Sequence, residues 1–177
     1  GAIIARKYWD RGKACPVAVV NGEDPALFIA GFEYLPDGQS EYDFAGSIKG
    51  APIDVMAGPV TGLPLPAQAE IILEGELLPA SEMTLPEGPF GEFTGYYAAD
   101  ARPCPVMAVK AIHHRDNPIL LGSPPMKPPR FHFGLPFRAA SIWSNLEMAG
   151  VTDVVGVWQH VAQLMTVVAI RQRYAGH

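Results

Sequence analysis

Two glutamates flank a rigid turn in the middle of the chain, in the segment Glu87-Gly88-Pro89-Phe90-Gly91-Glu92. Proline fixes φ and glycine adopts backbone angles that other residues avoid, so the path between the two acids is tightly constrained. Both carboxyl groups can therefore face one cavity. In an apolar cavity, desolvation keeps one carboxyl protonated while a cationic neighbour keeps the other ionised. The pattern is typical of an acid/base site, and its alternative is a solvated hairpin turn with two surface glutamates.

The elements that position this turn are expected to be short. The 18 glycines and 18 prolines interrupt the chain too often for long helices, so the sequence predicts short strands joined by tight loops. Asp24 followed by Pro25 predicts a helix start, and Lys49-Gly50 predicts a helix end. Helices are predicted at 2–11, 24–32, 41–48 and 137–149, and strands at 17–20, 53–56, 69–78, 106–113, 154–158 and 164–170.

The strand patterns predict the fold class. Residues 17–20 are all apolar, which predicts a strand buried on both faces. In the strand at 69–78, Ile71 and Leu73 are expected on one face and Glu74 and Glu76 on the other. The segment from Gly58 to Gly62 is interpreted only as a turn between strands. Because the strands and helices do not alternate regularly, the pattern favours an α+β, barrel-like sheet over a doubly wound fold.

Composition excludes several functional classes. Hydrophobic residues make up 49% of the chain and charged residues 18%, which predicts a large buried interior or an apolar interface. No apolar run approaches the roughly 18 residues of a membrane span, and a membrane protein is not expected. The net charge of −5, without a basic stripe, argues against nucleic-acid binding. The two cysteines belong to no CxxC motif, and no signal peptide is visible, so a reducing cytoplasm is the expected location.

Other candidate motifs carry weaker signals. His113-His114 is a possible metal pair by residue type, but neighbouring strand residues face opposite sides and cannot readily bind one ion. We interpret this pair as a strand end at the surface. No serine lies in a nucleophile elbow, and no glycine-rich phosphate-binding fingerprint is present. The glutamate pair thus remains the main candidate site.

The string PEGPFGEFTGYY, preceded by EIILEGEL at 70–77, closely resembles the central region of the UbiD-like decarboxylases, which use prenylated FMN. In that family both glutamates of EGPFGE are catalytic, and they correspond to Glu87 and Glu92. The segment PDGQSE at 36–41 resembles the family's PDG-x-x-E, whose glutamate helps to bind a divalent metal under the flavin phosphate. That glutamate corresponds to Glu41, which on its own is an ordinary helix-start acid.

The resemblance also implies how the site works. It implies reversible, non-oxidative decarboxylation of an aromatic or α,β-unsaturated carboxylic acid, with Glu92 as the proton donor and Glu87 ionised against an arginine. Phe93 is a wall of the substrate pocket or, alternatively, a core residue. The implied metal is Mn2+ or Mg2+ bound by Glu41, with K+ as a further cation. Residues that match a family stretch approaching the cofactor and the monovalent cation through its backbone are Ala30, Gly31, Phe32 and Glu33.

The resemblance further implies the fold, the domain organisation and the partners. It implies a split β-barrel of the FMN-binding type with short flanking helices over 1–125, and a linker with the start of a C-terminal α/β domain over 126–177. The family's paired arginine, and its metal-binding asparagine and histidine, lie before the matched region, so we expect the core of a longer enzyme. A flavin prenyltransferase is the expected cofactor supplier, and a homo-oligomer, dimer or hexamer, is the expected assembly.

Two rival functions remain open from the sequence. One is a non-catalytic flavin-binding or oligomerisation module that keeps the barrel without turnover, because a fold does not guarantee a function. The other is a glycosidase-type pair, which needs carboxyl groups about 5–9 Å apart in an open cleft. The specific substrate and the physiological direction of the reaction also stay open.

Overall fold

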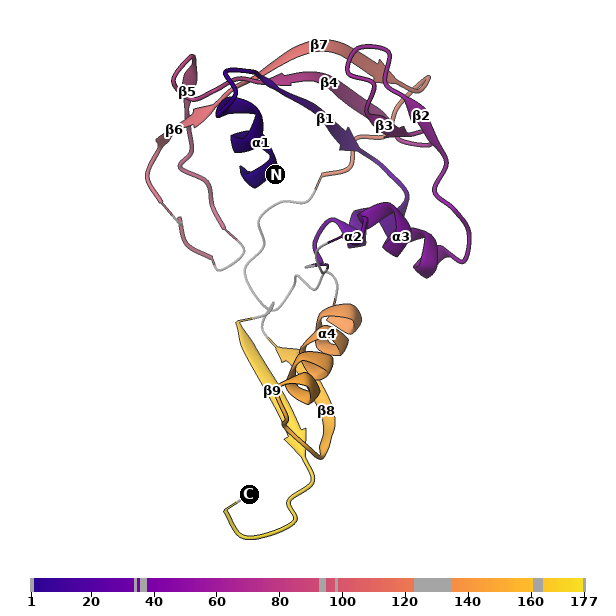
Figure 1. Ribbon diagram of the computed structural model, residues 1–177, viewed down its shortest axis with the longest axis vertical. Coiled ribbons are helices and arrows are strands. Elements are labelled where there is room, and N and C mark those ends of the chain that lie inside the picture. The colour runs from indigo at the N-terminus through magenta and orange to yellow at the C-terminus, as the bar shows by residue number, and fades with distance from the viewer. Residues whose placement is uncertain are drawn as a thin grey trace.

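A computed structural model describes residues 2–33, 35, 38–92, 95–97, 99–122, 135–160 and 164–176. Within these ranges the chain forms helices and small antiparallel sheets, with the N-terminal elements grouped around one sheet and the C-terminal elements forming a second group (Figure 1). The mixed α and β character predicted from the sequence is confirmed. Among the described helices, none combines the length and the apolar character that crossing a bilayer requires.

The helices begin and end where local signals place them. They are α1 (Ala2–Trp9), α2 (Pro25–Ala30), α3 (Glu41–Lys49) and α4 (Leu135–Met148). The side chain of Asp24 caps α2 by accepting a hydrogen bond from the Ala26 amide at 2.9 Å. Gly50 ends α3 with φ of 72°, a left-handed conformation that glycine adopts without strain. All four predicted helices are therefore confirmed, with small differences at their ends.

The largest sheet joins three strands that are distant in the sequence. These are β1 (Cys15–Asn21), β4 (Ile71–Leu77) and β7 (Met107–His114), antiparallel in the order β1-β4-β7. A register shift interrupts the β4–β7 pairing between Glu74 and Gly75. The burial predicted for 17–20 on both faces was wrong, because β1 is an edge strand of this sheet and the Val19 side chain is 47% exposed.

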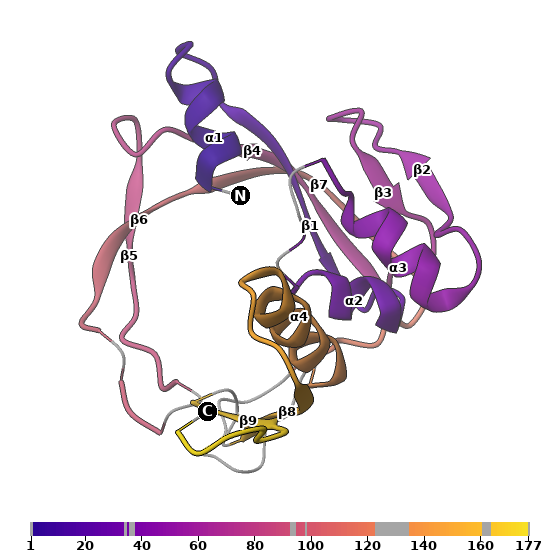
Figure 2. The same ribbon diagram turned by 60° about the horizontal axis from the view of Figure 1, so that its bottom comes forward.

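The other strands form three separate hairpins. They are β2 (Val55–Ala57) with β3 (Pro64–Pro66), β5 (Thr84–Glu87) with β6 (Arg102–Pro105), and β8 (Val154–His160) with β9 (Met165–Ile170). The β5–β6 hairpin extends away from the three-stranded sheet, and α4 lies beside α2 and α3 (Figure 2). An edge-to-face contact between Phe44 and Phe137, with ring centroids 6.0 Å apart, joins α3 to α4.

Most buried apolar residues of the described chain lie in two small clusters, with Ala5 and Cys15 buried outside them. One gathers alanines of α2 and α3, namely Ala26, Ala30 and Ala45. The other lies between β3 and β4 and contains Leu65, Ala69 and Ile72. Trp9 connects α1 to the sheet, since its indole N–H donates a hydrogen bond to the Leu77 carbonyl at 3.1 Å. The β5–β6 hairpin, whose strands lie between β4 and β7 in the chain, carries the glutamate pair.

Candidate active site

Glu87 and Glu92 line one pocket of about 90 Å³. Glu87 is the last residue of β5, and Glu92 follows it across a turn in which the Gly88–Pro89 peptide bond is cis and Gly88 has φ of 91°. Because a positive φ of this size is strained for a residue with a side chain, the backbone conformation at position 88 requires glycine. Both glutamates are exposed in this chain. The predicted convergence of the two acids is therefore present, in an open pocket.

Hydrogen bonds hold the main chain of the second glutamate, Glu92, in a tight loop. The amide of Glu92 donates a hydrogen bond to the Tyr96 carbonyl at 2.9 Å, and the amide of Gly95 donates to the Glu92 carbonyl at 2.9 Å. Gly91 and Tyr97 form an isolated antiparallel bridge around this closed loop. Phe93, the predicted wall of the substrate pocket, lies outside the described residues.

The residues predicted to approach a cofactor lie at the end of α2. Ala30 is fully buried, and Gly31 caps the helix by donating to the Leu27 carbonyl at 3.1 Å. Phe32 is half exposed, and its ring contacts Phe28 edge to face at a centroid distance of 5.0 Å. This group lies on a different element from the glutamate pair.

Glu33 lines a second pocket, of about 120 Å³, together with residues of α4. Burial raises the pKa of the Glu33 carboxyl, and the positive charge of Arg138 opposes that shift. The polar α4 side chains in this pocket include Ser141 and Asn145. The end of α2 and one face of α4 therefore form a polar recess beside the predicted cofactor segment.

Glu41, the predicted metal ligand, is the first residue of α3 and is exposed. It follows Ser40, whose hydroxyl caps the helix by accepting from the Tyr42 amide at 3.1 Å. Within the described residues, no three His, Cys, Asp or Glu side chains gather to form a metal site. Pro36 and Asp37 of the PDG-x-x-E segment lie outside the described residues.

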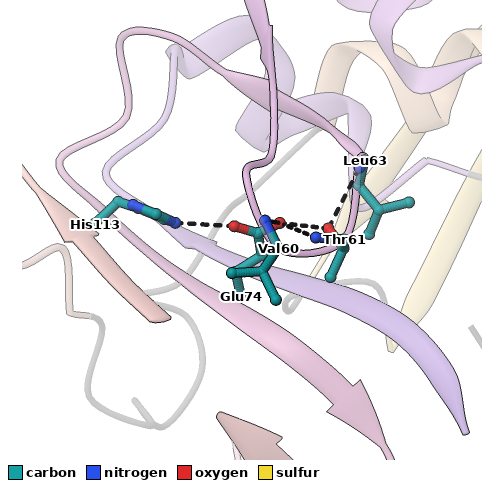
Figure 3. A network of polar contacts seen from close by, with 5 residues as sticks. All are labelled: Val60, Thr61, Leu63, Glu74 and His113. Carbon is teal, nitrogen blue, oxygen red and sulfur yellow. Dashed lines mark hydrogen bonds and ion pairs between the residues drawn. The ribbon is translucent and has the colours of Figure 1, made fainter. Parts of the chain in front are cut away.

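The sequence did not identify the polar network around Glu74, which is fully buried (Figure 3). Its Oε1 accepts hydrogen bonds from the amides of Val60 (3.1 Å) and Thr61 (2.6 Å) and from the Thr61 hydroxyl (2.6 Å), and its Oε2 lies 2.9 Å from His113 Nε2. Burial alone raises the pKa of Glu74, but the hydrogen bonds from Thr61, His113 and Val60 outweigh it and lower the pKa to about 2.

This network gives two sequence features a structural role. The segment from Gly58 to Gly62 is a turn, as predicted, but its amides also bind the carboxylate of β4. His113 is half-buried against Glu74, whereas His114 is exposed, with its Nδ1 3.0 Å from the Arg115 carbonyl. The two imidazoles have different partners, as the alternation of strand residues predicts.

Comparison with known proteins identifies the family of this chain. The family model described as the 3-octaprenyl-4-hydroxybenzoate carboxy-lyase Rift-related domain, UbiD, matches residues 1–128. A phenolic acid decarboxylase of Bacillus subtilis is 32% identical over 99% of this chain and 37% of its own length.

Solved structures agree with the sequence match. The UbiD-class enzyme HmfF from Pelotomaculum thermopropionicum, in complex with prenylated FMN, has a TM-score of 0.85 and 27% identity, over 97% of this chain and 40% of its own. The vanillic acid decarboxylase of Sedimentibacter hydroxybenzoicus in its open form has a TM-score of 0.82 and 26% identity, over 99% of this chain and 38% of its own. The chain thus spans about two fifths of these relatives, and it belongs to the UbiD family.

Proposed function

We propose that this chain supplies the glutamate pair of a carboxy-lyase that reversibly and non-oxidatively removes CO2 from an aromatic or α,β-unsaturated carboxylic acid. The observation that carries the proposal is the shared pocket of Glu87 and Glu92, the two acids of the EGPFGE motif. The relatives support an aromatic substrate, since two of them are named as phenolic acid and vanillic acid decarboxylases.

The two glutamates take different parts in this reaction. As the bond to the carboxylate carbon breaks and CO2 leaves, Glu92 delivers a proton to the substrate carbon and recovers one from solvent through the open pocket. Glu87 stays ionised, and its negative charge contributes to the electrostatic field around the substrate. When bound, prenylated FMN would accept the electron pair that remains on the substrate carbon as CO2 leaves, and one solved relative is a complex with this cofactor. Phe93 lines the substrate pocket in this proposal.

The residues proposed to hold the cofactor fit its chemistry. Glu41 presents an exposed carboxylate, the hard oxygen ligand that Mg2+ and Mn2+ prefer when phosphate oxygens complete the site. Ala30 to Glu33 would approach the cofactor and a K+ ion through their backbone, and the exposed ring of Phe32 would cover apolar ligand surface there. In the full-length protein, a split barrel over 1–125 would enclose the cofactor, and 126–177 would lead into the C-terminal domain.

The biological setting follows from this chemistry. We place the enzyme in the cytoplasm, where a flavin prenyltransferase supplies its cofactor and where it assembles as a homo-oligomer. The rival with the same fold is a module that binds flavin without turnover.

One experiment separates these functions. The full-length protein is produced with and without a co-expressed flavin prenyltransferase, and flavin absorbance and CO2 release are measured with phenolic, heteroaromatic and acrylic acids. Decarboxylation that depends on the prenyltransferase supports the proposal. Bound flavin without CO2 release from any of these acids supports the non-catalytic module instead, and a protein without flavin contradicts both.

A further inference from the structure

The polar recess between the end of α2 and one face of α4 is a candidate binding site in its own right. It has a volume of about 120 Å³, and among the described residues it shares no lining residue with the pocket of the glutamate pair. The described residues that line it are Glu33, Arg138, Ser141, Ile142 and Asn145. The α4 residues follow Arg138 at i+3, i+4 and i+7, so one face of the helix carries all of them.

Neighbouring contacts support both walls of this recess. On the α2 side, the Glu33 amide donates a hydrogen bond to the Ala30 carbonyl at 3.1 Å, which turns the chain at the helix end. On the α4 side, the ring of Phe137, next to Arg138, contacts Phe44 edge to face, and α4 lies beside α2 and α3 (Figure 2). Because both walls are held by the fold, the recess is formed before a ligand binds, which lowers the entropic cost of binding.

The recess can both donate and accept hydrogen bonds. Arg138 has only donors, and Asn145 has an NH2 donor and a carbonyl acceptor. The Ser141 hydroxyl already donates to the Phe137 carbonyl at 3.0 Å, so the lone pairs of its oxygen are what it offers to a ligand. The carboxyl group of Glu33 adds further acceptor oxygens. A ligand group that satisfies this set must itself donate one hydrogen bond and accept another.

A hydroxyl group on an aromatic ring has these properties. A methoxy group or a second carboxylate only accepts, and would leave the acceptors of Glu33 and Ser141 without a donor. Pockets that hold a whole small ligand are usually about 300–1,000 Å³, so a recess of about 120 Å³ has room for one substituent and the adjoining edge of the ring. Ile142 supplies an apolar wall for that edge.

We propose that this recess is the subsite for a phenolic hydroxyl group of the substrate. Arg138 and Asn145 donate hydrogen bonds to the hydroxyl oxygen, and Ser141 or Glu33 accepts its proton. Glu33 directly follows Phe32 in the segment proposed above to approach the cofactor, so the ring that carries the hydroxyl lies at that segment. The inference rests on the function proposed above, and it narrows the substrates from aromatic or unsaturated acids to hydroxylated aromatic acids.

The first test measures binding without turnover. The full-length protein is loaded with FMN instead of the prenylated cofactor, and isothermal titration calorimetry gives its affinity for five probes. The probes are meta- and para-hydroxybenzoic acid, benzoic acid, para-methoxybenzoic acid and terephthalic acid. The better-bound hydroxybenzoic acid should bind about 10–100-fold more tightly than the three acids without a hydroxyl group, because only a hydroxyl satisfies both the donors and the acceptors of the recess.

Variants of the recess should remove this preference. Arg138→Gln, Ser141→Ala and Asn145→Leu should each lower the ratio of the hydroxybenzoic to the benzoic acid affinity by about 10-fold, since each removes a hydrogen-bonding partner of the hydroxyl. Arg138→Lys should recover part of the ratio, because it keeps the charge and a donor. A variant that weakens both acids by the same factor would indicate a structural role and contradict the assignment of that residue.

Two control variants lie outside the recess. Ser144→Ala removes an exposed hydroxyl of α4, and Arg11→Gln removes an exposed guanidinium beyond α1, so both should keep the wild-type ratio. Equal affinities of the wild type for hydroxybenzoic and benzoic acid, or tightest binding of terephthalic acid, would overturn the inference. If Arg138→Gln does not fold, Ser141→Ala and Asn145→Leu decide the result.

The second test separates this inference from the proposed function. In the holoenzyme with prenylated FMN, the recess variants should raise KM for the hydroxybenzoic acid with little change in kcat, because the hydroxyl is bound equally before and during loss of CO2. A fall in kcat at unchanged KM would contradict a binding subsite. If the wild type releases CO2 from none of the acids, the proposed function fails, whereas the calorimetric ratios still decide whether the recess binds a phenolic hydroxyl.

Discussion

Glu74 is a single, fully buried residue that joins segments distant in the sequence. Its buried carboxylate joins the turn at Val60 and Thr61 to β4, and through His113 to β7. Gly58 is needed beside it, because a Cβ at that position would collide with the Glu74 carboxylate. The network contains four hydrogen-bonding contacts to one carboxylate, which explains why a charge is tolerated at a fully buried site.

This network predicts acid sensitivity. The folded-state pKa of Glu74, about 2, lies below its ordinary value of 4.5, so the stabilisation is fully present above pH 4.5 and is lost as the pH falls towards 2. Urea unfolding at a series of pH values should show the free energy of unfolding falling through this window. Glu74→Gln should flatten that dependence and be less stable at neutral pH. Glu76→Gln, a partly exposed acid of the same strand, is the control, and equal curves for the two variants would refute the assignment.

Glu41 carries a prediction about metal binding. Glu41→Gln in the full-length enzyme should lower divalent-metal content and flavin retention, because a hard cation depends on the carboxylate's charge. Asp43→Asn removes the other acid of the first turn of α3 and is the matched control. If Glu41 were only a helix-start acid, both variants would lose about 0.3–1 kcal/mol of stability and keep full metal and flavin. Metal analysis and absorbance spectra of the purified proteins distinguish these results.

Local sequence predicted part of the candidate site. Glycine and proline restrict the backbone between Glu87 and Glu92, so the two glutamates were expected to face one cavity. They do line one pocket, and residues adjacent in the sequence were enough to predict this. The burial of Glu74 could not be predicted, because a glutamate in an alternating strand resembles a solvent-facing residue. Its partners are 13 to 39 residues away in the sequence, and only the folded sheet brings them together.

Secondary-structure elements show the same division between local and long-range signals. The helix starts after Asp24 and at Glu41 were predicted from local sequence. Each follows a capping residue whose side-chain oxygen accepts from the amide two residues later, as Asp24 does from Ala26 and Ser40 from Tyr42. The strands β3, β5 and β6 were not predicted. Each contains proline, which lacks an amide donor and is disfavoured in a sheet interior, and each forms only a short two-stranded pairing.

The β4–β7 pairing is predicted to be sensitive at Gly75. A Cβ at this position would contact the Ala108 carbonyl oxygen and lie 3.1 Å from the Val109 Cα, and backbone atoms cannot move aside as a flexible side chain can. Gly75→Ala should therefore destabilise the protein by about 1–3 kcal/mol in urea unfolding. Gly122→Ala, where the added Cβ meets nothing within 4 Å, should be far milder. Equal stability of the two variants would contradict the packing described for this sheet.

At the scale of the whole molecule, the described residues include many large apolar side chains that are exposed. Ile119 and Leu120 are 73% and 72% exposed and, with Phe28 and Leu121, line a pocket of about 490 Å³. Only two small apolar clusters are buried within the described residues. Such surface is normally covered in the functional protein, and we expect further domains and a second subunit to cover it here.

We therefore predict that the full-length protein is an oligomer. Light scattering at micromolar concentration should give the mass of a dimer or of a larger assembly such as a hexamer. One solved relative is described as an evolved dimeric form, which agrees with this expectation. A stable monomer over the whole concentration range would contradict it, although it would leave the glutamate pair unaffected.

The most direct test of the central claim is the turnover of Glu92→Gln in the full-length enzyme loaded with prenylated FMN. The amide keeps the shape of the side chain but cannot donate and recover a proton, so CO2 release should be abolished while the flavin spectrum stays that of the wild type. Glu82→Gln, an exposed acid outside the pocket, should keep normal turnover. Wild-type CO2 release by Glu92→Gln with its flavin bound would remove Glu92 from the mechanism and contradict this account of the site.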